Sequence, residues 1–251
     1  MAFSSYHIMT IVASFFSHLA IFKWLAPWML RKASPVFATL PLDKQIVTRN
    51  RVMSAFHGAV TGGMGLYVFL YPGEAIPTQI WHDSPAFRHA TCIIMGYAQA
   101  DTLLMLFNTC LQDRLMIVHH AIACIAAYAG SVIPALPYYG NFWVLMELSS
   151  PFVNLRMILY SLGQERSRLY LLNGILMLVT FFTCRVMTIP LWFQLAEPMA
   201  TGELYEIGPL LFFTIVVLTP IIYGMNIYWF GKMCSKSYQH LYHTLFSNYW
   251  L

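Results

Sequence analysis

Two adjacent histidines, His119 and His120, lie inside an apolar stretch that runs from Leu115 to Ile133. A histidine side chain can act as a general base or as a nucleophile that forms an acyl-imidazole. Ionisable groups inside a membrane-spanning segment are costly and are usually retained for a function. Successive residues of a helix point about 100° apart. We therefore expect one ring to face a polar chamber and the other to orient it or to bind a neighbouring helix.

The composition is that of a membrane protein. Of the 251 residues, 59% are hydrophobic and 10% are charged, whereas soluble domains carry about 25% charged residues. A chain of this length is sufficient for one helical bundle but not for a bundle with a sizeable soluble domain. The net charge of +4 comes from basic residues in short loops beside apolar segments. We expect a membrane-embedded chain and no nucleic-acid partner.

Seven apolar segments are long enough to cross a bilayer, which takes about 20 residues. We therefore predict an all-α fold, a polytopic membrane bundle of seven transmembrane helices. The predicted spans lie near His7–Leu30, Val52–Tyr71, Ala86–Leu106, Leu115–Ile133, Tyr139–Leu159, Leu169–Leu195 and Gly208–Gly231.

Charged residues between the spans predict the orientation of the bundle. The first, third and fifth loops and the tail hold basic residues at Arg31, Lys32, Lys44, Arg49, Arg51, Arg114, Arg166, Arg168, Lys232 and Lys236. The second and sixth loops are mainly acidic, and the fourth carries no charge. By the positive-inside rule, the N-terminus is lumenal or outside the cell and the C-terminus is cytosolic.

Six polar residues from five predicted helices lie at a similar depth. Counted at about 1.5 Å per residue, each falls roughly 6–9 Å below the cytosolic boundary. They are His57, Asp101, His119, His120, Asn154 and Asn226. If these helices face one another, the residues form a polar layer close to the cytosol. Asp101 is the expected orienting carboxylate because it shares the depth of the histidines.

The fifth predicted helix adds a second polar group. Glu147, Ser150 and Asn154 follow i, i+3, i+7 spacing and share one face. Pro151 cannot donate a backbone hydrogen bond, so it frees the carbonyl of Glu147 as a further acceptor. Arg185, on the sixth helix, lies at a depth close to that of Glu147. A structural ion pair between these two residues is the favoured interpretation.

Other residues predict how the helices pack. Prolines within the spans predict kinks, and they occur at Pro27, Pro151, Pro190 and Pro220. Small residues on the second helix predict a close helix contact, at Gly62, Gly63 and Gly65. Several polar residues also have a purely structural interpretation as hydrogen bonders between helices, namely His57, Asn154 and Asn226.

Several of these residues stand in segments that resemble a known family. The segments are Arg51-Val-Met-Ser-Ala-Phe-His57, Gly96-Tyr-Ala-Gln-Ala-Asp101, the His119-His120 pair and Glu147-Leu-Ser-Ser-Pro-Phe-Val-Asn-Leu-Arg156. They are similar to the TLC domain family, which includes the ceramide synthases. The blocks at Gly140-Asn-Phe and Leu172-Asn-Gly-Ile-Leu-Met resemble its TLC domain-containing protein 4 subfamily. The resemblance implies a TLC domain over residues 47–231. Residues 1–46 then hold the first transmembrane helix and a basic loop, and residues 232–251 form a cytosolic tail.

The resemblance also implies a function. TLC proteins are multi-pass proteins, usually of the endoplasmic reticulum, that are tied to membrane lipid composition. In ceramide synthases the histidine pair is catalytic, and a long-chain acyl group passes from acyl-CoA to a sphingoid base. His119 and His120 match that pair. The acidic motif that follows differs, because Glu147 matches one carboxylate while Ser150 stands at the second acidic position.

Two functions in lipid homeostasis are therefore open. The first is ceramide-synthase-like acyl transfer on a membrane lipid, with His119, His120 and Asp101 catalytic and acyl-CoA as a co-substrate. The expected substrate-binding or supporting residues are His57, Glu147, Ser150, Asn154, Arg185 and Asn226. The second is a non-catalytic regulator that binds a lipid headgroup in the same chamber. Neither function requires a resident cofactor.

Two other classes of helical membrane protein fit poorly. A seven-helix receptor is disfavoured because Leu115 follows Asp113-Arg114 in place of a tyrosine, and because the seventh helix has no Asn-Pro-x-x-Tyr. A di-iron oxygenase needs histidines at His-x-x-His-His spacing, which the nine histidines of this chain lack. We therefore expect no metal site.

Overall fold

The structure is a computed structural model that describes residues 4–71 and 73–246, with side chains described as far as Gln239. Within these residues, seven helices are long and apolar enough to cross a membrane, which confirms the predicted all-α, seven-span fold. They cover Ser5–Ala33, Leu42–Leu70, Pro85–Phe107, Arg114–Val132, Pro137–Ser161, Arg168–Thr201 and Pro209–Gln239. The described residues form no strand, and only an isolated bridge joins Trp81 to Ala135.

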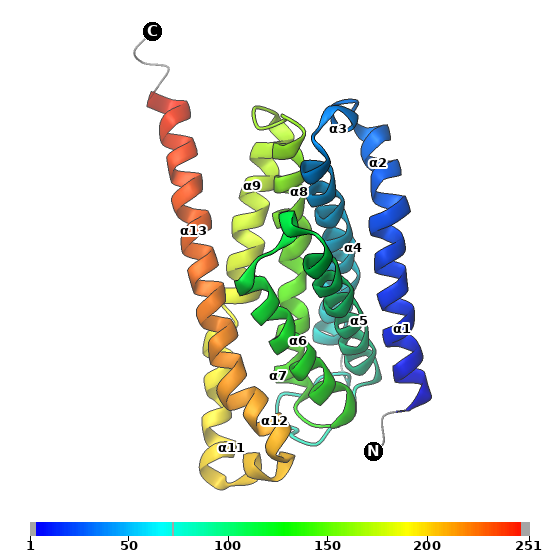
Figure 1. Cartoon of the computed structure of the whole chain (residues 1–251). Coiled ribbons are helices and arrows are strands. Elements are labelled where there is room, and N and C mark those ends of the chain that lie inside the picture. Colours follow the sequence, from blue (N-terminus) through cyan, green and yellow to red (C-terminus); the bar gives the residue numbers. More distant parts are fainter. Residues whose placement is uncertain (1–3, 72, 247–251) are drawn as a thin grey trace.

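Figure 1 shows how the helices of the bundle are arranged. The main elements are α1 (Ser5–Ala20), α2 (Ala26–Ala33), α4 (Leu42–Leu70), α5 (Pro85–Phe107), α6 (Arg114–Val132), α7 (Pro137–Leu145), α8 (Ser150–Ser161), α9 (Arg168–Phe181) and α13 (Thr219–Phe246). α4 contacts α5, α7 and α8. α1 and α6 both pack on α5, and α9 contacts both α8 and α13. This arrangement brings α4, α5, α6, α8, α9 and α13 to one inner space.

The two ends of the bundle differ in charge. α3 (Val36–Thr39), the connection between α8 and α9 and the C-terminal half of α13 lie at the top in Figure 1. This end carries the predicted basic loops, and we call it the basic end. The opposite end, with α11 (Ala196–Thr201) and α12 (Pro209–Phe213) at the bottom of Figure 1, is called the acidic end. Which end faces the cytosol stays a prediction.

The start of α4 corrects the sequence analysis. α4 begins at Leu42, well before the predicted start of the second span near Val52. Several residues before Val52 favour a helix, among them Lys44, Gln45 and Arg49, and Asp43 complements the positive end of the helix dipole in the first turn. The helix therefore continues beyond the apolar segment. As a result, Asn50 and Arg51 stand on a rigid helix rather than in a loop.

The prolines distort their helices as predicted. Three of them follow a π-helical turn, with Ile21–Leu25 before Pro27, Phe182–Val186 before Pro190 and Thr214–Leu218 before Pro220. A proline has no N–H for the carbonyl four residues earlier, and its ring crowds that carbonyl, so the turn widens. Pro151 instead follows a 3-10 turn at Met146–Ser149. Each distortion changes which backbone carbonyls are open to side chains.

The glycines of α4 allow the fifth span to approach closely. A Cβ atom on Gly62 would collide with the backbone of Leu148, and one on Gly65 would lie 2.8 Å from the backbone nitrogen of Leu145. The predicted small-residue contact is therefore confirmed at these two positions. It is wrong at Gly63, which faces open space. Gly58 was missed, although a Cβ there would lie 2.6 Å from Cβ of Ser150.

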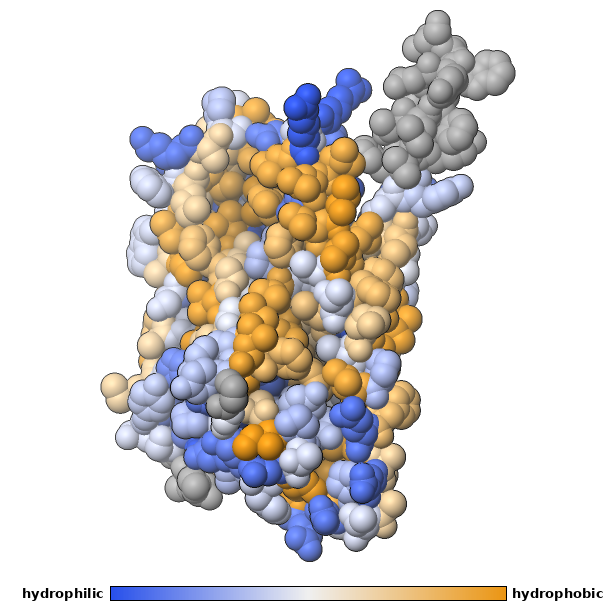
Figure 2. Space-filling view, turned by 180° about the vertical axis from the view of Figure 1, so that it is seen from behind, coloured by the Kyte–Doolittle hydropathy of each residue, from blue (hydrophilic) through white to orange (hydrophobic). Residues whose placement is uncertain are grey.

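The outer surface is apolar where the bundle would contact lipid. Figure 2 shows a hydrophobic band across the middle of one face, with hydrophilic residues gathered toward both ends. Phe16, Ile175 and Ile227 are more than half exposed, whereas His57 and Asn226 are buried. Apolar side chains thus face outward and polar ones face inward, because polar groups inside a bilayer must find partners within the protein.

Candidate functional site

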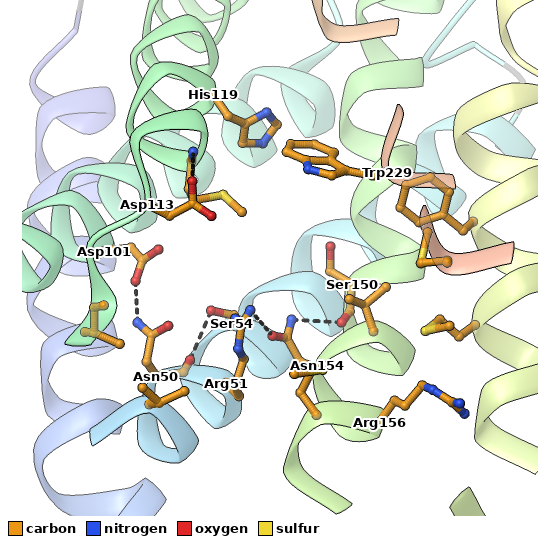
Figure 3. Close-up of a pocket in the computed structure, with 18 of the residues that line it drawn as sticks. Asn50, Arg51, Ser54, Asp101, Asp113, His119, Ser150, Asn154, Arg156 and Trp229 are labelled. Atoms are coloured by element: carbon orange, nitrogen blue, oxygen red, sulfur yellow. Dashed lines mark hydrogen bonds between the residues drawn. The ribbon is translucent and has the colours of Figure 1, made fainter. Parts of the chain in front are cut away.

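A polar cavity of about 520 Å³ opens toward the basic end of the bundle. Seven of the predicted site residues line it, namely Asp101, His119, His120, Glu147, Ser150, Asn154 and Arg185. We call this cavity the polar chamber. Figure 3 shows its open centre, with His119 and Trp229 on one side and Asn50, Arg51 and Asn154 on the other.

His120 is held by neighbouring side chains on α5. Its Nε2 lies 3.6 Å from Oδ2 of Asp101, and its Nδ1 lies 3.3 Å from Oγ1 of Thr102. The other carboxylate oxygen of Asp101 accepts a hydrogen bond from Nδ2 of Asn50 on α4. Both ring nitrogens of His120 therefore have a polar neighbour, and the ring is buried. The predicted proximity of Asp101 to the histidine pair is present, and it is His120 that Asp101 approaches.

His119 has different surroundings. Its ring meets the indole of Trp229 edge to face, with centroids 5.5 Å apart. Its Nδ1 is enclosed by the protein but has no hydrogen-bond partner within the described residues. His119 also lines a second, apolar cavity next to the chamber. The two rings thus point to different environments, as their offset on one helix requires, although both line the polar chamber.

The predicted ion pair between Arg185 and Glu147 is wrong, because Ser150 stands between them. Nη2 of Arg185 donates to Oγ of Ser150 at 3.1 Å, and that hydroxyl donates to Oε2 of Glu147 at 2.8 Å. Within the described residues, ion pairs occur only between Arg88 and Asp83 and between His120 and Asp101. The hydroxyl at the second acidic position therefore links a buried cation to the remaining carboxylate.

The rest of the Arg185 guanidinium is held by the turn before Pro151 and by α13. Nε donates to the carbonyl of Met146 at 3.1 Å and to Oγ of Ser149 at 2.8 Å. Nη1 donates to Oδ1 of Asn226 at 3.0 Å. Because the turn at Met146–Ser149 is 3-10 rather than α-helical, its carbonyl and hydroxyl point toward the arginine. A cation buried this deeply needs such acceptors in place of water.

Two predicted residues lie behind the chamber wall rather than on it. His57 is buried and stacks on Tyr97, with ring centroids 3.7 Å apart, and Tyr97 separates it from the chamber. Asn226 is fully buried behind Arg185. Asn154 does line the chamber, and it accepts from Arg51 of α4 at 3.5 Å. The interpretation of Asn154 and Asn226 as contacts between helices is therefore confirmed, whereas a single open layer of six residues is wrong.

Among the chamber residues that the sequence analysis missed are Asn50, Arg51, Ser54 and Tyr97. Tyr97 donates to Oγ of Ser54 at 2.9 Å, and Ser54 donates to the carbonyl of Asn50 at 3.0 Å. This chain of contacts ends at Asp101, so it fixes the carboxylate beside His120. A signal was present, since residues 50, 54, 57 and 61 are polar at helical spacing. It was hidden because the helix was expected to begin near Val52.

The second cavity is a narrow apolar arm of about 70 Å³. It shares His119, Glu147 and Arg185 with the polar chamber, so the two spaces meet at these residues. Its other walls are mostly small or apolar, including Ala123, Ala126, Ala127, Gly130, Leu136, Gly140, Leu211 and Ile215. It extends toward the acidic end, where the ring of Phe87 lies against Gly130 and Gly140. A polar space joined to an apolar one suits an amphipathic molecule.

The residues that line the chamber carry more positive than negative charge. The cations are Arg51, Arg156, Arg185, Lys232 and Lys236, and the carboxylates are Asp101, Asp113 and Glu147. Such a surplus attracts anionic groups. No group of three or more metal-binding side chains is present among the described residues.

Seven helices that are long and apolar enough to cross a membrane define a multi-pass membrane protein, with a polar chamber between several of them. The sequence matches the TLC domain family over residues 48–235, so the chain belongs to that family. It is 31% identical to human TLC domain-containing protein 4 over 234 residues, which are 91% of this chain and 89% of the human one. It is also 31% identical to the Xenopus tropicalis protein of the same name, over 94% of this chain and 92% of the other. These relatives confirm the predicted subfamily.

A more distant relative comes from a fungus. An uncharacterized TLC domain-containing protein of Schizosaccharomyces pombe is 26% identical over 180 residues, or 72% of this chain and 60% of the yeast protein.

Proposed function

We propose that this protein binds an acylated membrane lipid and transfers its acyl group, or one from acyl-CoA, at His119. One observation carries the proposal: His119, Glu147 and Arg185 border both the polar chamber and the apolar arm. A lipid that places the first carbons of its acyl chain in the arm would present its carbonyl carbon at this junction. Headgroup or phosphate charges would then lie toward the basic end of the bundle.

The reaction needs one proton carrier at the junction. A ring nitrogen of His119 accepts the proton of an acceptor hydroxyl or amine while that oxygen or nitrogen attacks the acyl carbonyl. The bond from the carbonyl carbon to the leaving sulfur or oxygen then breaks. The leaving group takes the proton back from His119, so atoms and charge balance.

Arg185 is suited to stabilise the negative charge that develops on the carbonyl oxygen. An arginine has five N–H groups, of which Nε, one on Nη1 and one on Nη2 donate to protein atoms. Two N–H groups remain for a substrate oxygen. Because the guanidinium is already fixed by its other contacts, little reorganisation is needed when charge develops.

His120 and Asp101 have a positioning role in this proposal. Nε2 of His120 lies beside Asp101 and Nδ1 lies beside Thr102, so both ring nitrogens already have a polar neighbour. The two residues fix the end of α6 against α5. His119, the next residue on α6, is thereby held at the junction. This narrows the catalytic assignment from the histidine pair to His119.

The test is acyl transfer by purified full-length protein in lipid nanodiscs. Isotope-labelled acyl-CoA or labelled phospholipid is supplied with a mixture of lipid acceptors, and products are read by mass spectrometry. We expect a labelled acyl lipid from the wild type and a loss of at least about 100-fold in His119→Ala, the scale of general acid–base catalysis. His89→Ala is the matched control, because His89 contacts Tyr6 at the acidic end. No product from the wild type with either donor would exclude acyl transfer.

A second candidate function is lipid binding without turnover. It is favoured by the position of the carboxylates, since Asp101 lies beside His120 and Glu147 is bonded to Ser150. His119 then has no orienting carboxylate of its own. The protein would hold a lipid in the same two cavities and influence membrane composition through its bound state. Co-purified lipid that stays chemically unchanged in the assay above would favour this function.

The proposed compartment is the endoplasmic reticulum, with the basic end in the cytosol and the N-terminus in the lumen. The support is membership of the TLC domain family and the concentration of basic residues at one end of the bundle. An N-glycosylation acceptor placed before Tyr6 should be modified in cells, whereas one placed after the last residue should not. The reverse pattern would contradict the orientation.

A further inference from the structure

A second polar feature lies on the outside of the bundle, at the basic end. It is a hollow of about 540 Å³ between the first span and α4. Its walls are Lys23, Trp24, Pro27, Trp28, Arg31, Lys32 and Arg49. None of these residues lines the polar chamber or the apolar arm. We call it the basic hollow, and the function proposed above makes no use of it.

The local structure explains why these side chains share one surface. Residues four apart lie on the same side of a helix, which groups Lys23 with Pro27 and Arg31, and Trp24 with Trp28 and Lys32. The π-helical turn at Ile21–Leu25 precedes Pro27 and shifts this face by the extra residue it inserts. π-helical turns of this kind occur often at functional sites. The proline and the turn therefore set the geometry of the hollow.

The fourth cation, Arg49, comes from α4. Its Nη2 donates to Oε1 of Gln45 at 3.2 Å, and its guanidinium carbon lies 6.0 Å from the ring of Phe37. Its Nε is enclosed and has no hydrogen-bond partner within the described residues. Arg49 also repels the charge of Arg31 across the hollow. Gln45 is neutral, so it does not balance the charge of Arg49.

The charge of the basic hollow is not balanced by any acidic partner within the described residues. No acidic residue lines it, and among the described residues no carboxylate lies within ion-pair distance of Lys23, Arg31, Lys32 or Arg49. Four cations held around one space repel one another, and an anion in that space removes the repulsion. The structure therefore favours a ligand with negative charge.

The two tryptophans indicate where that ligand resides. Trp24 is 64% exposed and Trp28 is 60% exposed, and both lie near the basic end of an apolar span. Tryptophan prefers the boundary between hydrocarbon and headgroups. Lys23 lies deeper, and its long side chain can extend toward the headgroups. The hollow thus combines indoles at the level of lipid chains with cations at the level of lipid phosphates.

We propose that the basic hollow binds the headgroup of an anionic phospholipid from the leaflet at the basic end, with Arg31 and Arg49 on its phosphate. This site is independent of the acyl-transfer proposal. A bound lipid would join the first span to α4 from outside. Free phosphate and acyl-CoA carry the same phosphate chemistry, but they lack two acyl chains beside Trp24 and Trp28, so both should bind more weakly here.

The test is lipid binding to purified full-length protein in detergent, measured by native mass spectrometry. Phosphatidylcholine, phosphatidylserine and phosphatidylinositol 4-phosphate are titrated separately, with inorganic phosphate and palmitoyl-CoA as the soluble arms. We expect the anionic lipids to bind more tightly than phosphatidylcholine. Arg31→Gln/Arg49→Gln should weaken anionic-lipid binding roughly 30-fold, from about fivefold for each cation near the membrane surface. Binding of phosphatidylcholine should not change.

The matched control is Arg166→Gln/Arg168→Gln. It removes two exposed arginines at the same end, one in the connection between α8 and α9 and one at the first residue of α9, so it changes the net charge equally. It should alter binding by less than about twofold. If Arg31→Gln/Arg49→Gln does not fold, the double variant Lys23→Gln/Lys32→Gln replaces it, because both lysine side chains are exposed.

Three results would overturn the proposal. Equal binding of phosphatidylcholine and the anionic lipids would remove the charge preference. An equal loss in the Arg166/Arg168 control would show general attraction to the basic end. Inorganic phosphate or palmitoyl-CoA that binds as tightly as phosphatidylserine, and loses binding in Arg31→Gln/Arg49→Gln, would make the occupant a soluble molecule.

Discussion

The two ends of this bundle enclose different kinds of side chains. At the acidic end, an apolar cluster that includes Leu136, Leu204 and Leu211 fills the space between α6, α12 and the short helices near α11. At the basic end, the helices enclose a polar chamber with an unpartnered histidine nitrogen and a buried arginine. The comparison teaches that close packing stabilises one end, whereas the other keeps polar groups in place at a cost in stability.

The largest expected effect comes from the buried cation at the basic end. Arg185→Ala leaves Ser150, Ser149 and Asn226 without their donor and opens a space inside the bundle. We expect a loss of about 3–5 kcal/mol in the free energy of unfolding, as for other broken buried charge networks. Unfolding in mixed detergent and SDS measures it. A loss near zero would show that the hydrogen bonds around Arg185 do not stabilise the basic end.

At the acidic end, we expect a substitution to change stability only through the packing of apolar side chains. Leu204→Ala removes a side chain that is 1% exposed within the apolar cluster. We expect a loss of about 3 kcal/mol from the cavity that remains. Lipid binding in the chamber should not change, because Leu204 lines neither the polar chamber nor the apolar arm. A variant that folds but no longer binds lipid would break the proposed separation of the two ends.

A third prediction concerns Ser150, which links Arg185 to Glu147 through two hydrogen bonds. Ser150→Ala removes both the acceptor for Arg185 and the donor to Glu147. We expect a loss of about 1–3 kcal/mol in the free energy of unfolding, the cost of unsatisfied buried polar groups. Ser161→Ala, near the end of α8, is the matched control and should change it by less than about 0.5 kcal/mol. Equal losses of stability in Ser150→Ala and Ser161→Ala would contradict this link between Arg185 and Glu147.

The smallest effect on stability should come from His119. Its Nδ1 has no partner within the described residues, so His119→Ala loses the ring contact with Trp229 but no hydrogen bond from Nδ1. We expect a loss of about 0.5–1.5 kcal/mol, whereas His120→Ala should cost about 1–3 kcal/mol because Asp101 loses a neighbour. A large loss of stability in His119→Ala would indicate a structural role for this ring.

The sequence was sufficient for the seven spans and for part of the packing. Hydropathy finds the spans because hydrocarbon excludes polar backbone and charge, and Pro27 and Gly62 act through local geometry that sequence spacing reveals. The arrangement at Arg185 was not predictable. It depends on a 3-10 turn at Met146–Ser149, on a side-chain rotamer of Ser150 and on α13, which meet only in three dimensions.

The sequence predicted the depth of the chamber residues but not the directions of their side chains. Depth counting placed Asp101 with His119 and His120, because helices have a fixed rise. It could not tell that Tyr97 covers His57, since depth says nothing about which direction a side chain points around its helix. The start of α4 was missed because hydropathy reports only where the apolar segment begins, near Val52. The helix itself begins ten residues earlier in the chain, at Leu42.

The most direct test of this account is an experimental structure of the purified protein in lipid nanodiscs. The account predicts density for a bound lipid that passes from the polar chamber into the apolar arm, with its carbonyl region beside His119 and Arg185. A chamber and arm that hold only water, or an imidazole of His119 turned outward into the surrounding hydrocarbon, would contradict it.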